Sequence, residues 1–156
     1  MFLQTKISKP ILKDLKKALK KLDREKEELT VVSCTKNGYQ SKNIISLFKK
    51  TLLKKAIQYK DFYKHVFHIH YIEYGEGGYQ ELHSHQTTED FSFIIYLNNS
   101  DGNTKFYEVL KGQPPVIVKP EEGRVVIFSS HFGHEATVSN KNKKVLVGAM
   151  FKKWMY

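Results

Sequence analysis

The chain has 156 residues and a formal net charge of +10, from 26 Lys and Arg residues against 16 Asp and Glu residues. A chain of this length buries roughly two-thirds of its unfolded surface, so it needs no disulfide to support its core. It has a single cysteine, Cys34, which excludes an intramolecular disulfide and fits a reducing cytoplasm. No apolar run approaches the roughly 18 residues of a membrane span, and residues 1–6 are too short for a signal peptide. We therefore expect a cytoplasmic protein with one domain, residues 1–156, and no membrane contact.

The positive charge raises the question of nucleic acid as a partner. The excess consists mostly of Lys, and Arg occurs only at Arg24 and Arg124. Arg is the better residue for paired contacts with phosphates and base edges. The chain also lacks a helix-turn-helix, a zinc finger and an RNP-type aromatic pair. A solvated lysine face is the favoured interpretation, and a nucleic-acid-binding module is a less favoured alternative.

Two helices are predicted within residues 1–62. Leucines spaced by three and four residues, after Pro10 in the first turn, predict an amphipathic helix over residues 9–28. A short strand, Leu29–Thr35, and a turn, Lys36–Ser41, follow; the turn contains an Asn-Gly dipeptide. A second helix is predicted over roughly residues 43–60, with its lysines away from its apolar face. This region is expected to support the rest of the domain from outside.

From Tyr63 the apolar residues alternate with period two, which is typical of strands. Strands are predicted at 64–74, 80–85, 91–98, 104–110, 115–119, 124–130, 134–139 and 144–153, separated by turn signals that include Gly75–Gly78. Two helices followed by about eight short strands predict a mainly β fold with flanking helices. The core, residues 63–153, is expected to be a jelly roll, also called a double-stranded β-helix, with both helices packed outside it.

A pair of histidines follows the Gly-rich stretch. His83 and His85 are two residues apart, so on a strand they point to the same face. A third histidine on a neighbouring strand, His134, can complete a set of three ligands that leaves open positions on Fe, Zn, Cu or Ni. His131 lies three residues earlier and competes with His134. The alternative is that His83 and His85 are polar residues on a solvent face.

Three further histidines receive a different interpretation. His68 and His70 form a second pair, but no Gly-rich turn precedes them, and we interpret them as structural or solvent-facing. His65 is interpreted as a surface residue.

Part of the pattern resembles the cupins. Their first motif is matched by Gly77, His83, His85 and Glu89. Their second motif is not completed, since Pro120 and Gly123 have the wrong spacing and the next histidine is His131. A cupin-type metal enzyme or metal-binding module without 2-oxoglutarate is therefore an alternative.

A fuller resemblance, over residues 64–152, is to the prolyl-4-hydroxylase-like branch of the 2-oxoglutarate/Fe(II)-dependent oxygenases. The matching residues, in order, are Tyr74-Gly75, His83-Ser84-His85, Tyr96-Leu97-Asn98, Gly102-Asn103-Thr104-Lys105-Phe106, Pro120-Glu121-Glu122-Gly123-Arg124, Phe128, His134-Glu135 and Lys144. With the segment that starts at Asn37, the chain resembles a small uncharacterised subgroup of bacteria and phages that carries HxH in place of HxD.

The resemblance implies a dioxygenase, in most relatives a hydroxylase, that uses Fe(II), 2-oxoglutarate and O2, with ascorbate as an optional reductant. The implied catalytic metal ligands are His83, His85 and His134. The implied cation for the far carboxylate of 2-oxoglutarate is Lys144, deep in the barrel on the last strand. Tyr74 and Tyr96 occupy positions where relatives place tyrosines that line the 2-oxoglutarate pocket.

The departure from the family pattern is His85, which stands where most relatives carry an acid. His85 can itself be the ligand, Glu89 or Asp90 can supply the carboxylate, or water can fill the position. The first alternative is favoured because it needs no movement of a loop. The prime substrate, a small molecule or a protein side chain, is not readable from the sequence. Nor is the choice between monomer and homodimer, for which the apolar stripe of the first helix and residues Trp154–Tyr156 are candidate contacts.

Overall fold

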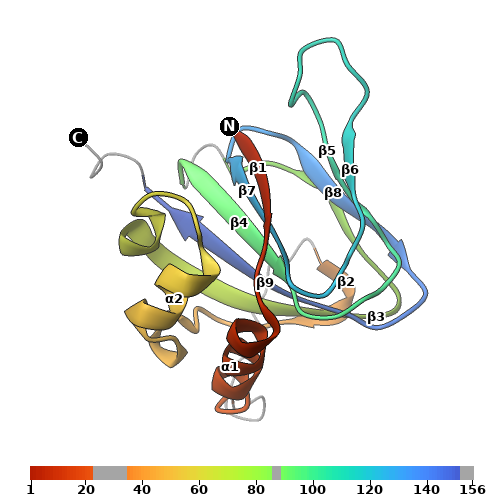
Figure 1. Cartoon of the computed structure of the whole chain (residues 1–156). Helices are drawn as coiled ribbons and strands as arrows, with labels where there is room; N and C mark the ends of the chain where they lie inside the picture. Colours follow the sequence, from red (N-terminus) through yellow and green to blue (C-terminus); the bar gives the residue numbers. More distant parts are fainter. Residues whose placement is uncertain (23–34, 86–88, 152–156) are drawn as a thin grey trace.

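The computed structural model describes residues 1–22, 35–85 and 89–151. Its elements are β1 (Phe2–Lys6), α1 (Lys9–Leu19), β2 (Thr35–Gln40), η2 (Ile45–Leu47), α2 (Lys50–Ala56), η3 (Phe62–His65), β3 (Val66–His83), β4 (Phe91–Tyr96), β5 (Thr104–Phe106), β6 (Val116–Val118), β7 (Arg124–Ser129), β8 (His134–Ser139) and β9 (Lys143–Met150) (Figure 1). Most of the predicted strand Leu29–Thr35, Cys34 and the Trp154–Tyr156 tail lie outside the described residues.

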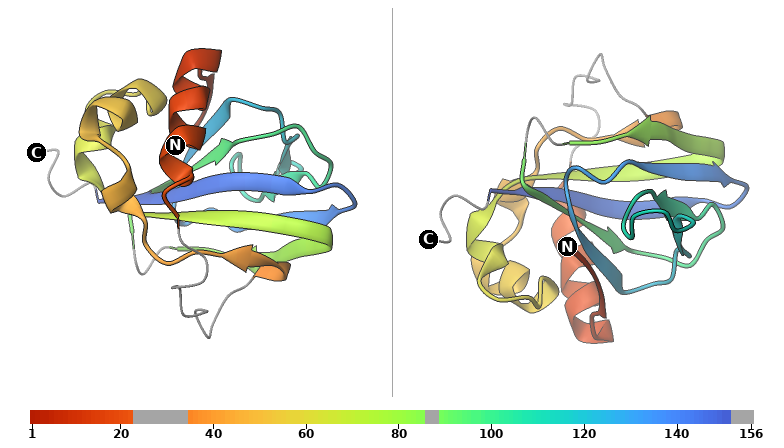
Figure 2. Two further views of the ribbon diagram at one scale, coloured as in Figure 1. Left: turned by 90° about the horizontal axis from the view of Figure 1, so that it is seen from below. Right: turned by 90° about the horizontal axis from the view of Figure 1, so that it is seen from above.

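The strands form one nine-stranded sheet in the order β1-β7-β4-β9-β3-β8-β5-β6, with β2 added alongside β3. Every pair of neighbours is antiparallel. Figure 2 shows that the sheet curls round on itself and that both helices lie outside the curl. The predicted jelly roll with external helices is therefore confirmed. Among the described residues, no helix is long and apolar enough to cross a membrane.

The alternation of side chains along the strands creates two cores. One fills the inside of the curl and includes Ile72, Tyr96 and Phe128. The other lies between the outer face of the sheet and the helices, where α1 buries Leu12 and Leu15. The lysines of α1 and α2 are exposed, as the amphipathic pattern predicted.

The outer core is tightest at Gly148, in the middle of β9. A Cβ atom there would lie 2.1 Å from ring atoms of Phe93 on β4. Glycine is therefore required by this close approach, as is common for glycine inside a strand.

Several predicted boundaries are wrong. Gly75–Gly78 is not a turn, because β3 runs through it from Val66 to His83. The predicted turn Lys36–Ser41 is instead largely strand β2, which pairs with β3 across a register shift between Lys36 and Gly38. Gly38 is required there, since a Cβ atom would lie 2.5 Å from the Glu73 carbonyl oxygen. The Asn-Gly signal thus marks a bulge in a strand.

Two further differences concern the region before the barrel. β1 was not predicted; it pairs along its whole length with β7. The second helix is shorter than predicted, with a separate turn η2 before α2. Lys49, the residue before α2, has extended backbone angles, which separates the two.

Candidate metal centre and barrel pocket

Three histidines converge at one end of the curl. His83 ends β3, His85 lies two residues later, and His134 begins β8. The strand register places His83 directly opposite His134. The backbone N–H of His85 donates to the Ser130 carbonyl at 2.9 Å, which fixes the backbone position of His85. One nitrogen from each ring lies within 4.8 Å of the others, and the described residues contain no other such group of ligand atoms.

The Nδ1 atom of each ring faces an acceptor. His83 Nδ1 lies 2.7 Å from the Glu81 carbonyl oxygen. His134 Nδ1 lies 3.1 Å from the Phe132 carbonyl oxygen. His85 Nδ1 lies 3.5 Å from Glu89 Oε1. Acceptors at Nδ1 favour the tautomer that leaves Nε2 free to bind a metal, and this arrangement is usual for metal-binding histidines.

The same three rings are held in the neutral form. Burial, followed by the repulsion of a charged His83, lowers the pKa of His85 to about 4 and that of His134 to about 3. Burial also lowers the pKa of His83. Neutral imidazole is the form that binds a metal, so the donor set suits a divalent ion at neutral pH.

Two acids and one histidine were alternatives for this set. Asp90 and His131 have exposed side chains and do not join it. Glu89 does not belong to the three-residue group either. It lies behind His85, where its Oε2 accepts a hydrogen bond from Ser92 Oγ at 2.6 Å. The structure thus brings His83, His85 and His134 together as predicted.

His68 and His70 lie closer to the centre than their interpretation as structural or solvent-facing residues implied. They line a cavity of about 240 Å³ that His85 and Glu89 also line. Their Nδ1 atoms are 3.3 Å apart. Burial, then the charges of His68, His85 and His83, lowers the pKa of His70 to about 3. This cavity beside the three histidines is a candidate entrance for a substrate.

The prediction that Lys144 lies deep in the barrel is wrong. Lys144 is exposed and lines a cavity of about 390 Å³ on the outer face, beside the end of α1. Its neighbour Lys143 is 1% exposed. Lys143 shares the inner face of β9 with Val145, so alternation along the strand assigns the inward position to Lys143.

The inward lysine has two close partners. Lys143 Nζ donates to the Gly102 carbonyl at 2.8 Å and lies 4.2 Å from the centre of the Tyr74 ring. Burial lowers the pKa of Lys143 to about 8, opposed by the charge of Asp101. Among the described residues, no carboxylate forms an ion pair with this lysine.

A buried tyrosine on β4 contacts a buried threonine on β5. Tyr96 is 1% exposed, and its hydroxyl lies 2.6 Å from Thr104 Oγ1. Burial raises the pKa of Tyr96 well above its usual range. Tyr74 and Tyr96 both lie in the inner core, and their role in lining a 2-oxoglutarate pocket stays a prediction. Lys143 and Thr104 were not identified as site residues; the period-two pattern that ends at Val145 could have identified Lys143.

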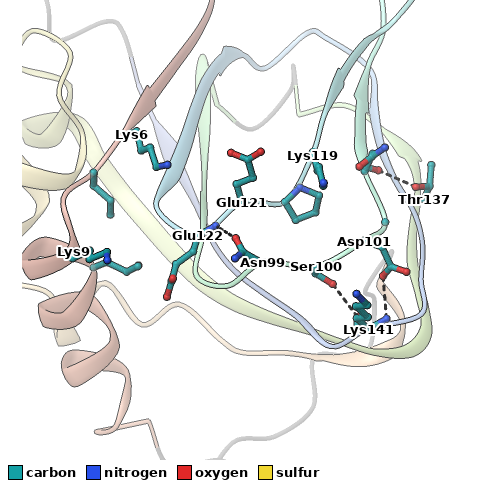
Figure 3. A pocket seen from close by; sticks show the side chains of 15 residues that line it. Lys6, Lys9, Asn99, Ser100, Asp101, Lys119, Glu121, Glu122, Thr137 and Lys141 are labelled. Carbon is teal, nitrogen blue, oxygen red and sulfur yellow. Dashed lines mark hydrogen bonds between the residues drawn. The ribbon is translucent and has the colours of Figure 1, made fainter.

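A larger cavity, of about 870 Å³, lies elsewhere (Figure 3). It is lined by the loops around Asn99–Asn103 and Lys119–Glu122 and by Lys141, at the end of β8 away from His134. Its Asp101 carboxylate accepts hydrogen bonds from the backbone N–H groups of Asn140 and Lys141. The Asp101 carboxylate therefore stabilises the β8–β9 turn. None of the three histidines lines this cavity.

A family model described as the 2OG-Fe(II) oxygenase superfamily matches residues 58–155. The chain belongs to this superfamily. It is therefore a 2-oxoglutarate-dependent oxygenase by family, and the cofactors of the family are Fe(II), 2-oxoglutarate and O2. The expected resemblance to the 2-oxoglutarate/Fe(II)-dependent oxygenases is confirmed. A search of curated proteins finds no match.

Solved structures share the fold at low sequence identity. A prolyl-4-hydroxylase from Pseudomonas putida superposes with a TM-score of 0.70 at 14% identity, covering 97% of this chain and 92% of its own. A prolyl hydroxylase from Trichoplax adhaerens, in complex with a peptide fragment of hypoxia inducible factor, gives 0.69 at 11% identity, with coverage of 98% and 84%. HygX from Streptomyces hygroscopicus, with nickel and 2-oxoglutarate bound, gives 0.70 at 9% identity, with coverage of 97% and 83%.

Proposed function

We propose that this protein is an Fe(II)- and 2-oxoglutarate-dependent hydroxylase with a three-histidine metal centre. His83, His85 and His134 are the metal ligands in this proposal. Lys143 binds the far carboxylate of 2-oxoglutarate, and Tyr74, Tyr96 and Thr104 line the pocket around it. When bound, the metal and 2-oxoglutarate supply the oxidising chemistry.

The observation that carries the proposal is a buried lysine, Lys143, that forms no ion pair with a carboxylate among the described residues. A charged group taken out of water is unfavourable unless an opposite charge or a full set of hydrogen bonds compensates it. Lys143 has one carbonyl and one aromatic face as partners, which leaves donors on its ammonium group available. In this proposal the ammonium group binds the far carboxylate of 2-oxoglutarate, whose other end is held at the three histidines.

The protein residues have separate tasks. The carbonyls of Glu81 and Phe132 hold two imidazoles in the metal-binding tautomer. The Tyr96 hydroxyl, kept protonated by burial and engaged with Thr104, can donate or accept hydrogen bonds at the pocket wall. The apolar inner core excludes water around the pocket, which strengthens the attraction between Lys143 and a carboxylate.

The alternative without 2-oxoglutarate depended on the inner lysine. A solvent-facing Lys144 favours the cupin-type alternative, and Lys144 is exposed. We propose that the buried Lys143 takes the role expected of Lys144, which supports the 2-oxoglutarate hypothesis instead. In the part of the chain that the structure describes, no observation favours nucleic acid as the substrate, and the cavity beside His68, His70 and Glu89 is small and also lined by apolar residues such as Phe67 and Val147. We propose that a small molecule or a protein side chain is the part that enters.

The test is the formation of succinate from 2-oxoglutarate with Fe(II) under air. Uncoupled turnover needs no prime substrate, so its absence from the assay does not prevent the test. We expect succinate that depends on Fe(II) and O2 and is lost in His134→Ala. A protein that binds neither Fe(II) nor 2-oxoglutarate by calorimetry and forms no succinate would refute the proposal. Lys144→Met is the matched control, since it changes an exposed residue on the same strand.

A further inference from the structure

The three-histidine centre raises a question of charge. Three neutral imidazoles leave a divalent metal with its full charge of 2+, whereas two imidazoles and a carboxylate reduce it to 1+. The centre lies at the edge of an apolar core, where uncompensated charge is costly. A negative group close behind a ligand can offset part of this cost without binding the metal itself.

Glu89 has the position for this task. Its Oε1 lies 3.5 Å from His85 Nδ1, and its side chain is only 10% exposed. Its other oxygen accepts the hydrogen bond from Ser92 Oγ at 2.6 Å, and Ser92 is 1% exposed on β4. The backbone N–H of Glu89 also donates to the His85 carbonyl at 3.2 Å. The carboxylate is thus oriented from two sides toward the ring of His85.

We propose that Glu89 is a positioning residue that supplies, through His85, the negative charge that the missing carboxylate ligand would otherwise provide. The inference rests on the proposed function, since it requires His85 to bind the metal. A carboxylate at the far nitrogen of a metal-binding imidazole fixes its tautomer and orientation and makes the ring a stronger donor. His85 and Glu89 then act together: His85 binds the metal, and Glu89 orients His85 and supplies the negative charge.

Direct ligation by Glu89 is the competing arrangement. In the structure its carboxylate lies 3.5 Å from His85 Nδ1 and does not belong to the group of ligand atoms that His83, His85 and His134 form. The tight Ser92 contact holds Oε2 in that place. Direct binding would require the carboxylate to leave both partners.

The experiment compares Glu89→Gln with Glu76→Gln. The first keeps the size and an acceptor oxygen but removes the charge beside His85. The second removes an equal charge from an exposed residue of β3. Fe(II) affinity is measured anaerobically by chelator competition, and the Fe(III)/Fe(II) midpoint potential by titration. We expect Glu89→Gln to weaken Fe(II) binding by about 10- to 100-fold and to raise the potential. Glu76→Gln should change neither.

A double variant shows whether the effect passes through His85. In a His85→Ala background, adding Glu89→Gln should cause no further loss of affinity. An additive loss, an affinity loss in Glu89→Gln as large as in His85→Ala, or values equal to those of Glu76→Gln would each overturn the inference. A wild-type protein that binds no Fe(II) would instead refute the proposed function. Unchanged melting temperatures of the two Gln variants exclude a folding effect.

Discussion

Replacing Lys143 and Lys144 separately with Met gives the sharpest test of the pocket. The two residues are adjacent on β9 and carry the same charge. Lys143 is buried on the inner face, and Lys144 is exposed on the outer face. Any long-range effect of charge is nearly the same for the two variants, so a difference between them reports on the pocket.

The magnitudes follow from burial. Loss of one partner from a buried, hydrogen-bonded charge pair costs about 2–5 kcal/mol, which weakens binding roughly 30- to 4000-fold. Lys143→Met should therefore weaken 2-oxoglutarate binding by at least about 30-fold. Without an anion, the lowering of the Lys143 pKa from 10.5 to about 8 corresponds to roughly 3 kcal/mol against folding. The variant also loses the contact between the Lys143 ammonium group and the Tyr74 ring, which stabilises the wild type by about 1–2 kcal/mol. We therefore expect the free energy of unfolding of Lys143→Met at pH 7 to exceed that of the wild type by about 1–2 kcal/mol.

The sign of the pH effect can also be checked. Between pH 8 and 10.5 the unfolded chain keeps the Lys143 proton while the folded chain has released it, so wild-type stability rises with pH there. The difference in free energy of unfolding between Lys143→Met and the wild type should shrink over the same pH interval. Calorimetry with Mn(II) and 2-oxoglutarate, and urea unfolding of the protein alone, measure the two effects. Normal 2-oxoglutarate affinity in Lys143→Met, or its loss in Lys144→Met, would refute the assignment.

Three other outcomes are expected. His85→Ala should lower Fe(II) affinity further than Glu89→Gln does, whereas Asp90→Ala should leave it unchanged; metal titration checks both, and normal affinity in His85→Ala would contradict the ligand assignment. Gly148→Ala should lower the unfolding free energy by about 1–3 kcal/mol, because its Cβ would meet the Phe93 ring; urea unfolding measures this, and no loss would contradict the packing. The metal-free protein should lose stability as pH falls from 6.5 to about 4, because the histidines bind protons in the unfolded chain over this range but stay neutral while they are buried in the folded chain. His70→Gln should reduce that slope by up to about 1.4 kcal/mol per pH unit, and an unchanged slope would count against the burial of this ring.

The strand pattern was predictable because each barrel strand has one face in the inner core. The spacing of His83 and His85 identified their common direction, and β8 begins at the predicted His134. The placement of β1 and β2 was not predictable in the same way. Both lie beside strands that are distant in the sequence, and their pairing depends on tertiary contacts.

The inward lysine shows why a motif alone was insufficient. Lys143 and Lys144 are adjacent, so a one-residue error in register exchanges the inside and the outside of the barrel. Counting back from Val145 and Val147 would have assigned Lys143 to the inner face. The position of Glu89 behind His85 was not available from spacing, since it depends on the contact with Ser92 on β4.

A crystal structure with Mn(II) and 2-oxoglutarate bound would test the central claim most directly. We expect one metal bonded to His83, His85 and His134, with the far carboxylate of 2-oxoglutarate at Lys143 Nζ. A metal bonded to Glu89 in place of His85, or a 2-oxoglutarate whose far carboxylate lies away from Lys143, would contradict it.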